Sequence, residues 1–327
     1  MKILYIGGTG QISFACVHAS VRLGHDVHVF NRGNHNDGLP AETTFHVGDM
    51  TDDDAYARLA DERFDVVCQF RLFEPDHLAR EFDTFAGKCG RYVFISSASA
   101  YTKPLAHWRV SEDHGIDNPH WLYSRKKAEI ERRLAAQDDL PFVIVRPSHT
   151  YRTMLPATAV AREIAVSRML RGKPVVQHGD GTSLWTLTHA RDFAEPFARL
   201  IVDDRALGEA FHLTQDDAYP WDEITRAVGR AVAVNDPEIV HVPSDTLIRY
   251  HPDWEGPLLG DKTGSTLFDN TKIKSIVGDF DCPTSLDEGM KLAAALTRPS
   301  AADPYDADLD ALMDRIVADQ RSLGAAG

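Results

Sequence analysis

The chain of 327 residues is long enough for about two domains, or for one large α/β domain with a substantial lobe. Apolar residues make up 43% of the sequence and charged residues 26%, as in an ordinary soluble globular protein. The formal net charge of −14, from 49 acidic and 35 basic residues, argues against a general affinity for nucleic acid or anionic membranes. We therefore expect neither nucleic acid nor a membrane as a partner.

The cysteines and histidines do not predict a disulfide framework or a metal site. The four cysteines (Cys16, Cys68, Cys89 and Cys282) are far apart and form no Cys-x-x-Cys pair, which favours buried thiols in a reducing compartment. The 15 histidines form no tight His-x-x-x-His or His/Cys cluster, so we expect no bound metal. The N-terminus does not resemble a signal peptide, and no apolar stretch approaches the ~20 residues that span a bilayer. These features predict a cytoplasmic protein.

The first thirteen residues predict a strand, a glycine-rich turn and the start of a helix. Lys2 to Ile6 is a short apolar run, and helical apolar spacing begins at Ile12. Between them, Gly7-Gly-Thr-Gly10 permits a tight turn and close approach of a ligand to the backbone. Free N–H groups at the positive end of a helix bind phosphate, so we expect a nucleotide here. A plain strand-to-helix turn also selects glycine and is the alternative.

Strands and helices then alternate along the first half of the chain. This alternation predicts an α/β protein with a Rossmann-like, doubly wound parallel sheet and right-handed crossovers. Ligand chemistry is then expected at the carboxyl ends of the strands. Thr51 is expected to cap a short helix that begins with three aspartates. Further strands are expected at 26–30, 43–47, 64–70, 92–95 and 142–145, and helices at 75–85 and from the turn at 118–119 to about 137.

From about Thr150 the alternation loosens, which predicts a smaller C-terminal lobe. We assign residues 1–150 and about 186–214 to a dinucleotide-binding domain, and about 151–185 and 215–295 to a substrate-binding lobe. Residues 296–327 are expected to form a helical tail, packed on the body or on a partner. The expected elements are a helix at 158–170, a strand at 186–189, a helix at 191–200, a late strand of the sheet at 210–213 and a tail helix at 306–323.

The end of the second strand bears on the choice of cofactor. In a dinucleotide fold an acidic residue near this point holds the ribose hydroxyls, whereas an arginine can hold a 2′-phosphate. Asn31 and Arg32 stand here and no acid does, which favours NADP over NAD. An exposed loop arginine without such a role is the alternative.

Tyr123 and Lys127 are the candidate catalytic pair. They are spaced i and i+4 on an expected helix, so they share one face, ~5–6 Å apart at Cβ. A free tyrosine titrates near pH ~10, and a nearby ammonium lowers that value, so the pair can exchange a proton with a carbonyl or alcohol. Ser97 follows the fifth strand at the same sheet edge, where its hydroxyl can hydrogen-bond the substrate oxygen. Turn and cap chemistry is the alternative for the serines of this segment.

Together these segments resemble the extended short-chain dehydrogenases/reductases, as an atypical member of the NAD-dependent epimerase/dehydratase kind. The resemblance spans about residues 1–290 and implies a nicotinamide cofactor. It rests on the motifs Gly7-Gly-Thr-Gly10-Gln-Ile-Ser13, Gly48-Asp49, Ile95-Ser-Ser-Ala-Ser-Ala-Tyr101, Tyr123-x-x-x-Lys127, Arg146-Pro147, and Gly179-Asp-Gly181 followed by His189-Ala-Arg-Asp192.

The resemblance implies a role for each candidate residue. Ser97 would polarise the substrate oxygen, Tyr123 would transfer the proton, and Lys127 would hold the nicotinamide ribose and lower the pKa of the tyrosine. Ser99 is the nearest competitor of Ser97, His149 and His189 are expected to face the substrate cleft, and a homodimer through the Tyr123 helix is implied. The cofactor-binding candidates are Gly7, Thr9, Gly10, Gln11, Ile12, Asn31, Arg32, Asp49, Met50 and Lys127, and the substrate-side candidates are Ser99, His149 and Trp185.

The chain also departs from the family pattern. Ser13 replaces the third glycine of the loop, and Cys68-Gln-Phe-Arg71 replaces the usual His-Leu-Ala-Ala after the fourth strand. Trp185 stands where nucleotide-sugar enzymes carry an arginine that grips the diphosphate, and Ser148-His-Thr-Tyr151 lacks the usual asparagine. These changes make a nucleoside-diphosphate sugar a less expected substrate.

The sequence thus predicts an NAD(P)-dependent oxidoreductase or epimerase that transfers a hydride at a hydroxyl or keto carbon of a sugar-like substrate, nucleotide sugars included. Phe268-Asp-Asn-Thr-Lys-Ile-Lys274 resembles an atypical branch of the family that includes chloroplast RNA-binding members. A non-catalytic nucleotide- or RNA-binding protein that retains the fold is therefore the alternative. The net charge of −14 weighs against RNA.

Overall fold

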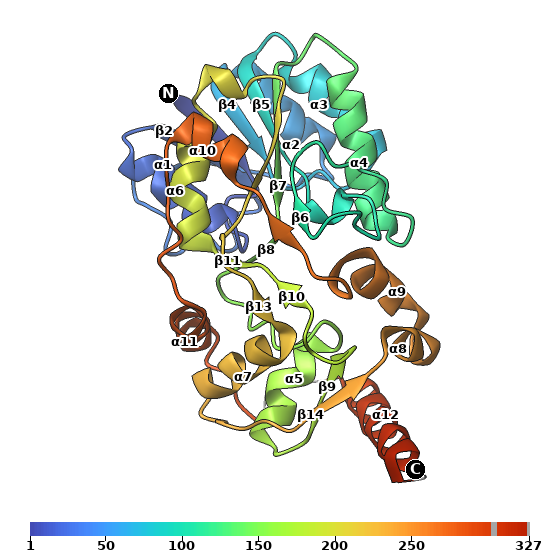
Figure 1. Cartoon of the computed structure of the whole chain (residues 1–327). Helices are drawn as coiled ribbons and strands as arrows, with labels where there is room; N and C mark the ends of the chain where they lie inside the picture. Colours follow the sequence, from blue (N-terminus) through green and yellow to red (C-terminus); the bar gives the residue numbers. More distant parts are fainter. Residues whose placement is uncertain (302–305, 326–327) are drawn as a thin grey trace.

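The computed structural model describes residues 1–301 and 306–325. Its upper part is a seven-stranded parallel sheet in the order β12-β7-β5-β4-β1-β2-β3 (Figure 1). The predicted Rossmann-like sheet is confirmed, including the late strand that pairs with β7. The strands are β1 (Lys2–Ile6), β2 (Asp26–Asn31), β3 (Thr44–Val47), β4 (Phe64–Gln69), β5 (Cys89–Ile95), β7 (Phe142–Pro147) and β12 (Ala210–Leu213).

Helices cover both faces of this sheet because its strands are apolar on both sides (Figure 1). In β1, Ile3 and Tyr5 pack with one layer of helices, whereas Leu4 and Ile6 pack with the opposite layer. All four side chains are fully buried, and such burial stabilises the fold by about 1.5–3 kcal/mol for each large apolar side chain. The first layer contains α1 (Ser13–Arg22) and α6 (Ala190–Leu200), and the second contains α2 (Asp53–Ala57), α3 (Leu78–Phe85) and α4 (Leu122–Ala135).

The order of the strands reverses beside β1. Ile6, the last residue of β1, is paired with Phe30 of β2 on one side and with Gln69 of β4 on the other. The chain therefore continues outward from β1 in both directions, and the carboxyl ends of β1 and β4 form the switch point of the sheet. Dinucleotides bind at such switch points.

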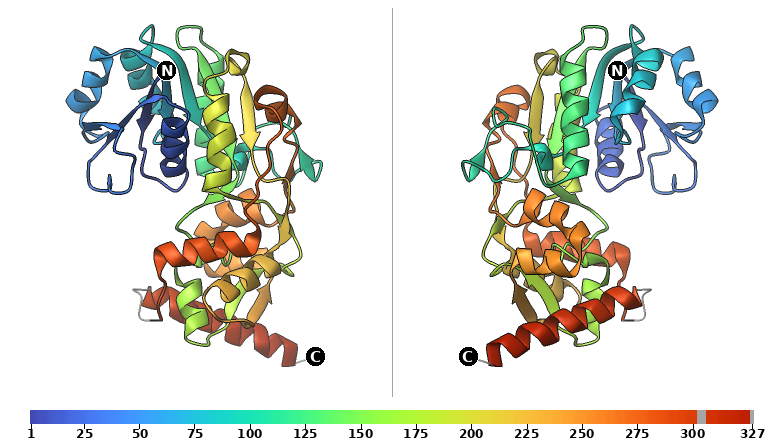
Figure 2. Two further views of the ribbon diagram at one scale, coloured as in Figure 1. Left: turned by 90° about the vertical axis from the view of Figure 1, so that its left-hand side faces the viewer. Right: turned by 90° about the vertical axis from the view of Figure 1, so that its right-hand side faces the viewer.

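A second, smaller body lies beyond the carboxyl ends of the strands (Figures 1 and 2). It has an apolar core of its own, in which Trp221, Leu258 and Met290 are fully buried. Its helices are α5 (Arg162–Leu170), α7 (Trp221–Ala231), α8 (Ser244–Tyr250), α9 (Glu255–Pro257), α11 (Leu286–Thr297) and α12 (Ala307–Ala325). Its short strand pairs are β8 (His149–Tyr151) with β11 (Leu187–His189), β9 (Val175–His178) with β14 (Ile239–Val242), and β10 (Leu184–Trp185) with β13 (Tyr219–Pro220).

The C-terminal helix α12 packs on this second body. Apolar side chains from one side of it join the core, and the buried Arg168 of α5 lies 2.5 Å from Asp310 and 2.9 Å from Asp314. The predicted tail helix is confirmed, while residues 302–305 and 326–327 of the predicted tail lie outside the described residues. Although α12 is the longest helix, neither it nor any other helix of the described residues is long and apolar enough to cross a bilayer.

Two predicted helix starts are wrong for local reasons. The helix expected from residue 158 begins at Arg162, because Ala161 adopts a left-handed conformation with a φ of +50°. Thr51 does not cap α2; the Asp52 carboxylate does, since it accepts the Ala55 N–H at 3.0 Å.

Candidate active site

The glycine loop joins β1 to α1 at the switch point. Gly7 has a φ of +89°, a conformation that residues with a Cβ rarely adopt. The Ser13 hydroxyl donates to the Gly7 carbonyl at 2.6 Å and accepts the Gly10 N–H at 2.9 Å. Ser13 therefore closes the loop on itself and occupies one N–H that a third glycine would leave free for a ligand.

Gln11 ties this loop to the segment that enters the second body. Its side-chain amide donates to Thr153 Oγ1 at 2.5 Å, and its side-chain carbonyl accepts the N–H groups of Arg152 at 3.1 Å and Thr153 at 2.9 Å. The Gln11 side chain is thus committed within the protein, which leaves its backbone for a cofactor. The neighbouring candidates Thr9 and Ile12 are partly buried in the same loop.

Asn31 and Arg32 follow β2, where we expect the adenosine of a dinucleotide. The Asn31 side chain donates to Asn36 at 2.7 Å and accepts the Gly33 N–H at 2.8 Å, so it shapes the loop. Arg32 is exposed, and no carboxylate of residues 1–301 and 306–325 lies within 4.0 Å of it. Its guanidinium is therefore available to an anion.

Asp49 and Met50 lie just beyond β3. Asp49 Oδ1 accepts the N–H of Thr51 at 2.9 Å and its hydroxyl at 2.8 Å. These hydrogen bonds lower the pKa of Asp49, and the charge of Arg32 adds to the effect. The Met50 carbonyl accepts a hydrogen bond from Arg80 at 2.5 Å, which fixes the backbone beside Asp49.

Three serine hydroxyls form a chain beyond β5. Ser124 Oγ of α4 donates to Ser99 Oγ at 2.7 Å, and the Oγ atoms of Ser99 and Ser97 are 2.8 Å apart. Ser97 Oγ also accepts the Ser99 N–H at 3.2 Å, so the cap chemistry weighed as an alternative is present. Ser99 is 4% exposed and Ser97 is more accessible, which favours Ser97 as the residue that meets a ligand.

Tyr123, in the first turn of α4, lies beside Ser97. Burial raises the pKa of Tyr123, whereas hydrogen bonding to the Ser97 hydroxyl counteracts the rise. The Lys127 ammonium is 5.9 Å from the centre of the Tyr123 ring. The expected lowering of the Tyr123 pKa is therefore not found, because burial dominates.

Lys127 lies one turn further along α4 and is 1% exposed. Its ammonium donates to the carbonyl oxygens of Leu72 at 2.7 Å and Ile95 at 2.8 Å. The pKa of Lys127 is lowered to about 7, chiefly by burial; Glu131 opposes this and the charge of Arg71 adds to it. An ammonium has three donors, and beyond these two hydrogen bonds the Lys127 ammonium faces the rings of Phe73 at 4.6 Å and Phe94 at 4.7 Å. Its third donor has no hydrogen-bond acceptor among the described residues and can serve a ligand.

Five of the predicted residues meet at one cavity of about 290 Å³, near the small end of ligand-binding sites, whereas Lys127 and the other cofactor-binding candidates do not line it. Ser97, Ser99, Tyr123, His149 and Trp185 all line it. Residues of both bodies contribute, so the cavity lies between the sheet and the second body. The remaining lining residues are Ala98, Trp121, Pro147, Ser148, Arg162, Asp261 and Lys262.

Trp185 and His149 are joined within this cavity. Trp185 Nε1 donates to His149 Nδ1 at 3.2 Å; because an indole N–H only donates, Nδ1 is the acceptor and the ring proton lies on Nε2. Burial holds the pKa of His149 well below its ordinary value, so the ring is neutral. His189, also expected to face the cleft, does not line the cavity; it caps α6, and its ring accepts the Arg191 N–H at 3.3 Å.

Sequence reasoning missed four charged or aromatic residues of the cavity. Trp121 stands two positions before Tyr123, and Arg162 opens α5 without an ion-pair partner among the described residues. Asp261 and Lys262 form an ion pair at 2.6 Å and come from a π-helical turn (Leu258–Lys262) far from any motif. Of these four residues, only Trp121 could have been inferred from the sequence, because it stands next to the Tyr123 motif.

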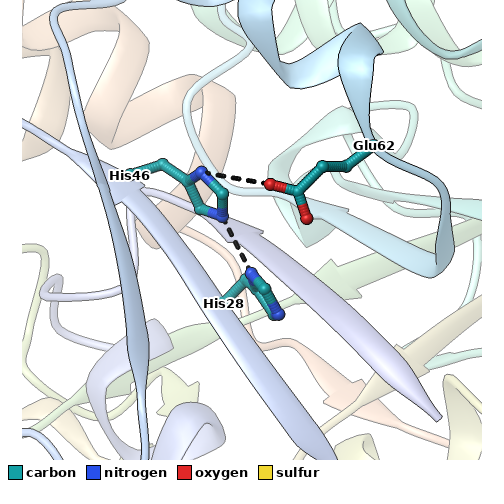
Figure 3. Close-up of side chains that lie close together, drawn as sticks. All are labelled: His28, His46 and Glu62. Carbon is teal, nitrogen blue, oxygen red and sulfur yellow. Dashed lines mark hydrogen bonds and ion pairs between the residues drawn. The ribbon is translucent and has the colours of Figure 1, made fainter.

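Figure 3 shows a separate cluster of His28, His46 and Glu62, whose ligand atoms lie within 4.8 Å of one another. His28 Nδ1 and His46 Nε2 are hydrogen-bonded at 2.8 Å, and His46 Nδ1 lies 3.9 Å from the Glu62 carboxylate. The Lys2 ammonium already pairs with Glu62, so this carboxylate has a cation. The sequence did not indicate the cluster, because β2 and β3 bring together histidines 18 residues apart. None of the three residues lines the cavity described above.

Comparison with known proteins gives this geometry its context. Residues 3–213 match the family described as the NAD dependent epimerase/dehydratase family. The chain belongs to this family. The resemblance found in the motifs is thereby confirmed.

Two curated relatives match the chain over most of its length. The chloroplast stem-loop binding protein of 41 kDa b from Arabidopsis thaliana is 27% identical over 257 residues, which is 73% of this chain and 65% of that protein. The 2′-dehydrokanamycin reductase of Streptomyces kanamyceticus is 29% identical over 238 residues, which is 71% of this chain and 67% of that protein. The chain thus spans only about two thirds of the length of these relatives.

Solved structures share the fold over 91% of the chain. An epimerase from Methanothermobacter thermautotrophicus has a TM-score of 0.70 at 18% identity, over 91% of this chain and 92% of that one. A UDP-glucose 4-epimerase from Thermotoga maritima, solved with UDP-glucose, has a TM-score of 0.69 at 19% identity, over 91% and 99%. A dTDP-glucose 4,6-dehydratase from Bacillus anthracis, in complex with NAD, has a TM-score of 0.70 at 17% identity, over 91% and 96%. At this identity the likeness shows the fold.

Proposed function

We propose that the protein is an NAD(P)-dependent oxidoreductase or epimerase that acts at a hydroxyl or keto carbon of a sugar-like substrate, with Ser97, Tyr123 and Lys127 as its catalytic residues. The observation that carries this proposal is that Ser97 and Tyr123 line the same cavity, with the buried Lys127 ammonium 5.9 Å from the centre of the Tyr123 ring. Family membership supports the cofactor class.

The residues at the switch point fit a nicotinamide dinucleotide. A Cβ on Gly8 would lie 2.8 Å from Val29, so the loop packs too closely for a side chain, as a loop that presents its backbone to a ligand requires. The free donor of Lys127 suits a ribose hydroxyl, and the glycine loop with Asp49 suits the diphosphate and adenosine. When bound, the cofactor supplies or accepts the hydride.

The side chains of this protein then transfer the proton and stabilise the substrate oxygen. Tyr123 Oη gives a proton to the substrate oxygen in reduction and takes it back in oxidation. Ser97 donates a hydrogen bond to the same oxygen, with its hydroxyl oriented by Ser99 and Ser124. The Lys127 ammonium, once a ligand covers the site, favours the phenolate form of Tyr123 and so eases the proton transfer.

The second body supplies the substrate side of the cavity, and we propose the division into a dinucleotide-binding domain and a substrate-binding lobe on that basis. Trp121 and Trp185 offer apolar ring surface, and His149 and Asp261 offer polar groups, a combination that suits a sugar. The indole of Trp185 cannot form the charge-assisted bonds of an arginine to a diphosphate. A sugar without a nucleotide is therefore the favoured substrate within this class.

The NADP preference rests on Arg32 alone. Its exposed guanidinium, near Asp49 and without another charged partner in the described part of the chain, is placed to meet a 2′-phosphate. Titration of the purified protein with NADPH and NADH tests this directly. Equal affinities, or tighter binding of NADH, contradict the preference.

The central test is a substrate screen followed by two matched variants. Oxidation and reduction of neutral sugars, keto sugars, sugar phosphates and nucleotide sugars are followed through cofactor absorbance, and C-epimers by product analysis. With any substrate found, Ser97→Ala should lower kcat by about 10²-fold or more. Ser96→Ala, whose buried hydroxyl has no partner among the described atoms, should leave kcat within about threefold. Full activity of Ser97→Ala contradicts the assigned chemistry.

A second candidate function rests on the Arabidopsis relative, which is named for stem-loop binding. In that case the fold would serve RNA rather than catalysis. Gel-shift titration with a structured RNA at 50 and 200 mM salt decides between the two. Salt-sensitive binding below micromolar Kd favours RNA, whereas the net charge of −14 leads us to expect none.

We also propose that the protein forms a homodimer with α4 at the interface. Leu122, at the start of this helix, is 56% exposed, which suits a contact with a second copy. Light scattering on the eluting protein should give twice the monomer mass. A monomer at micromolar concentration excludes the dimer.

A further inference from the structure

The segment after β4 departs from the family pattern, and a buried polar network holds it. Gln69 is fully buried, and its side-chain amide donates to the Tyr56 hydroxyl at 3.0 Å and to Glu81 Oε2 at 2.9 Å. The Glu81 carboxylate also accepts the hydroxyls of Tyr56 and Tyr92 at 2.7 and 2.9 Å. The remaining polar atom of Gln69, Oε1, accepts the Arg71 N–H at 2.7 Å. This network fixes where Arg71 leaves the sheet.

Arg71 lies against the glycine loop. Its Cγ is 2.6 Å from the position that a Cβ on Gly7 would occupy, so the two segments are in close contact across the switch point. The side chain is exposed, and its guanidinium has no ion-pair partner among the described residues. The guanidinium lies over the Phe73 ring, 5.2 Å from its centre.

Phe73 connects Arg71 to the catalytic pair. Its ring lies 4.6 Å from the Lys127 ammonium and 6.4 Å from the Tyr123 ring. Arg71 is close enough for its charge to act on Lys127. A free guanidinium therefore lies between the glycine loop and the proposed catalytic residues, where the middle of a bound dinucleotide would run.

The glycine loop itself offers fewer donors than usual. The Gly10 N–H is occupied by the Ser13 hydroxyl. A guanidinium binds a phosphate group with two parallel charge-assisted hydrogen bonds, which are about twice as strong as bonds from a neutral amide. Ser13 and Arg71 are thus complementary departures: the first withdraws a backbone donor, and the second adds a stronger one.

We propose that Arg71 binds the diphosphate of the dinucleotide cofactor, and that Gln69 is a positioning residue that aims it there. This inference rests on the proposed function. It assigns a role to a cofactor-side residue that the family motifs do not contain, and it explains the buried glutamine before it.

The test measures cofactor binding without the need for a substrate. NADH, NADPH and ADP-ribose are titrated into the wild type, Arg71→Gln and Arg71→Lys by calorimetry. Arg71→Gln should weaken all three ligands by about 10-fold to 100-fold, and Arg71→Lys by less, because each ligand carries the diphosphate. The matched control is Arg63→Gln, an exposed arginine just before β4, at the opposite end of that strand from Arg71, which should leave the affinities of all three ligands unchanged.

A double-mutant cycle tests the role of Gln69. Gln69→Leu should weaken NADH binding in the wild type but have little further effect in the Arg71→Gln background. Additive losses, with an unfolding midpoint lowered by Gln69→Leu, would instead mean a purely structural glutamine.

The outcomes separate this inference from the function on which it rests. If the wild type binds NADH and Arg71→Gln binds it within twofold as tightly, the role of Arg71 is overturned and the proposed function stands. If the wild type binds no dinucleotide, both are overturned. Selective loss of binding in Arg71→Gln, with a smaller dependence of affinity on salt, supports the inference.

Discussion

The two sides of the active-site cavity are built in different ways. On the cofactor side, the glycine loop and Arg71 follow β1 and β4, two neighbouring strands of one sheet, so hydrogen-bonded strand pairing sets their separation. On the substrate side, Trp185 lies on the two-residue strand β10, Arg162 opens α5 and Asp261 lies in a π-helical turn, so no single sheet sets their separation. A regular scaffold can be shared across a family while the loop-built side changes its substrate. The difference predicts that variants on one side leave the other side's binding intact.

The largest expected effect is on kcat, for a substitution of Tyr123 at the boundary between the two sides. Tyr123→Phe removes the proton donor, so kcat should fall by about 10²-fold to 10⁴-fold while the NADH Kd stays within twofold. Turnover of any substrate found for the wild type measures the first quantity, and calorimetry the second. Tyr250→Phe, which loses only a bond to Asp319 on the second body, is the control and should keep full activity. An active Tyr123→Phe variant would falsify the assignment.

On the cofactor side, Gly7→Ala should damage both binding and stability. The new Cβ meets Arg71 Cγ at 2.6 Å, and a φ of +89° is strained for alanine, so we expect at least a 10-fold weaker NADH affinity and about 1–3 kcal/mol less stability. Gly24→Ala is the matched control, since Gly24 has a φ of +80° and nothing within 4 Å of its Cβ position. It should lose stability and keep NADH affinity. Equal affinity losses in both variants contradict a local role of the loop.

Burial of Lys127, on the cofactor side, makes the free energy of unfolding depend on pH. Its pKa is about 7 in the folded protein against an ordinary value of 10.5, so between these limits the unfolded chain holds a proton that the folded protein lacks. The free energy of unfolding then rises with pH from about 7 to about 10, and the cost of burying the charge is fully present below pH 7. Lys127→Met removes this cost.

Urea unfolding at pH 6.5 and 9.5 measures the effect of Lys127→Met. Relative to the wild type, the variant should lose at least about 1 kcal/mol of stability between the lower and the higher pH. Lys126→Met, which loses a partly exposed ion pair with Glu74, should show no such trend. A pH-independent difference for Lys127→Met means that the ammonium is not desolvated as the structure indicates.

The smallest expected effect is on the substrate side. Trp185→Phe keeps an aromatic ring but removes the N–H that holds His149, so KM should rise about twofold to 10-fold, with NADH affinity unchanged. Trp108→Phe, at a position 65% exposed, is the control. A change in NADH affinity with Trp185→Phe would break the separation between the two sides.

The sequence predicted the regular part of the molecule well because the signals there are local and periodic. Apolar runs bounded by glycine or asparagine marked the strands of the sheet, and β1 was placed to the residue. The sequence also assigned Ser97, Tyr123 and Trp185 to the site, and all three line one cavity. These assignments were possible because their motifs follow strands or open a helix at characteristic positions of the fold. The catalytic roles themselves remain proposals.

The features that the sequence did not predict depend on tertiary contacts, which no local pattern of residues encodes. Lys262 and Arg162 reach the cavity through the folding of the second body, whose segments alternate without a regular period. His189 was misplaced because a strand-to-helix junction predicts both a cap and a cleft position, and the ring hydrogen bond to Arg191 decides for the cap. Burial likewise reversed the direction of the Tyr123 pKa, since the helix spacing reveals the neighbour but not the loss of water.

The side chain of Gln11 joins the two sides of the cleft by hydrogen bonds. Gln11 holds three hydrogen bonds to the chain that enters the second body, at 2.5, 3.1 and 2.9 Å. Parting the bodies at that point breaks all three, at a net cost of about 0.5–1.5 kcal/mol each. The glycine loop is therefore hydrogen-bonded to the substrate side at its own turn, and opening the cleft at this point costs these three bonds.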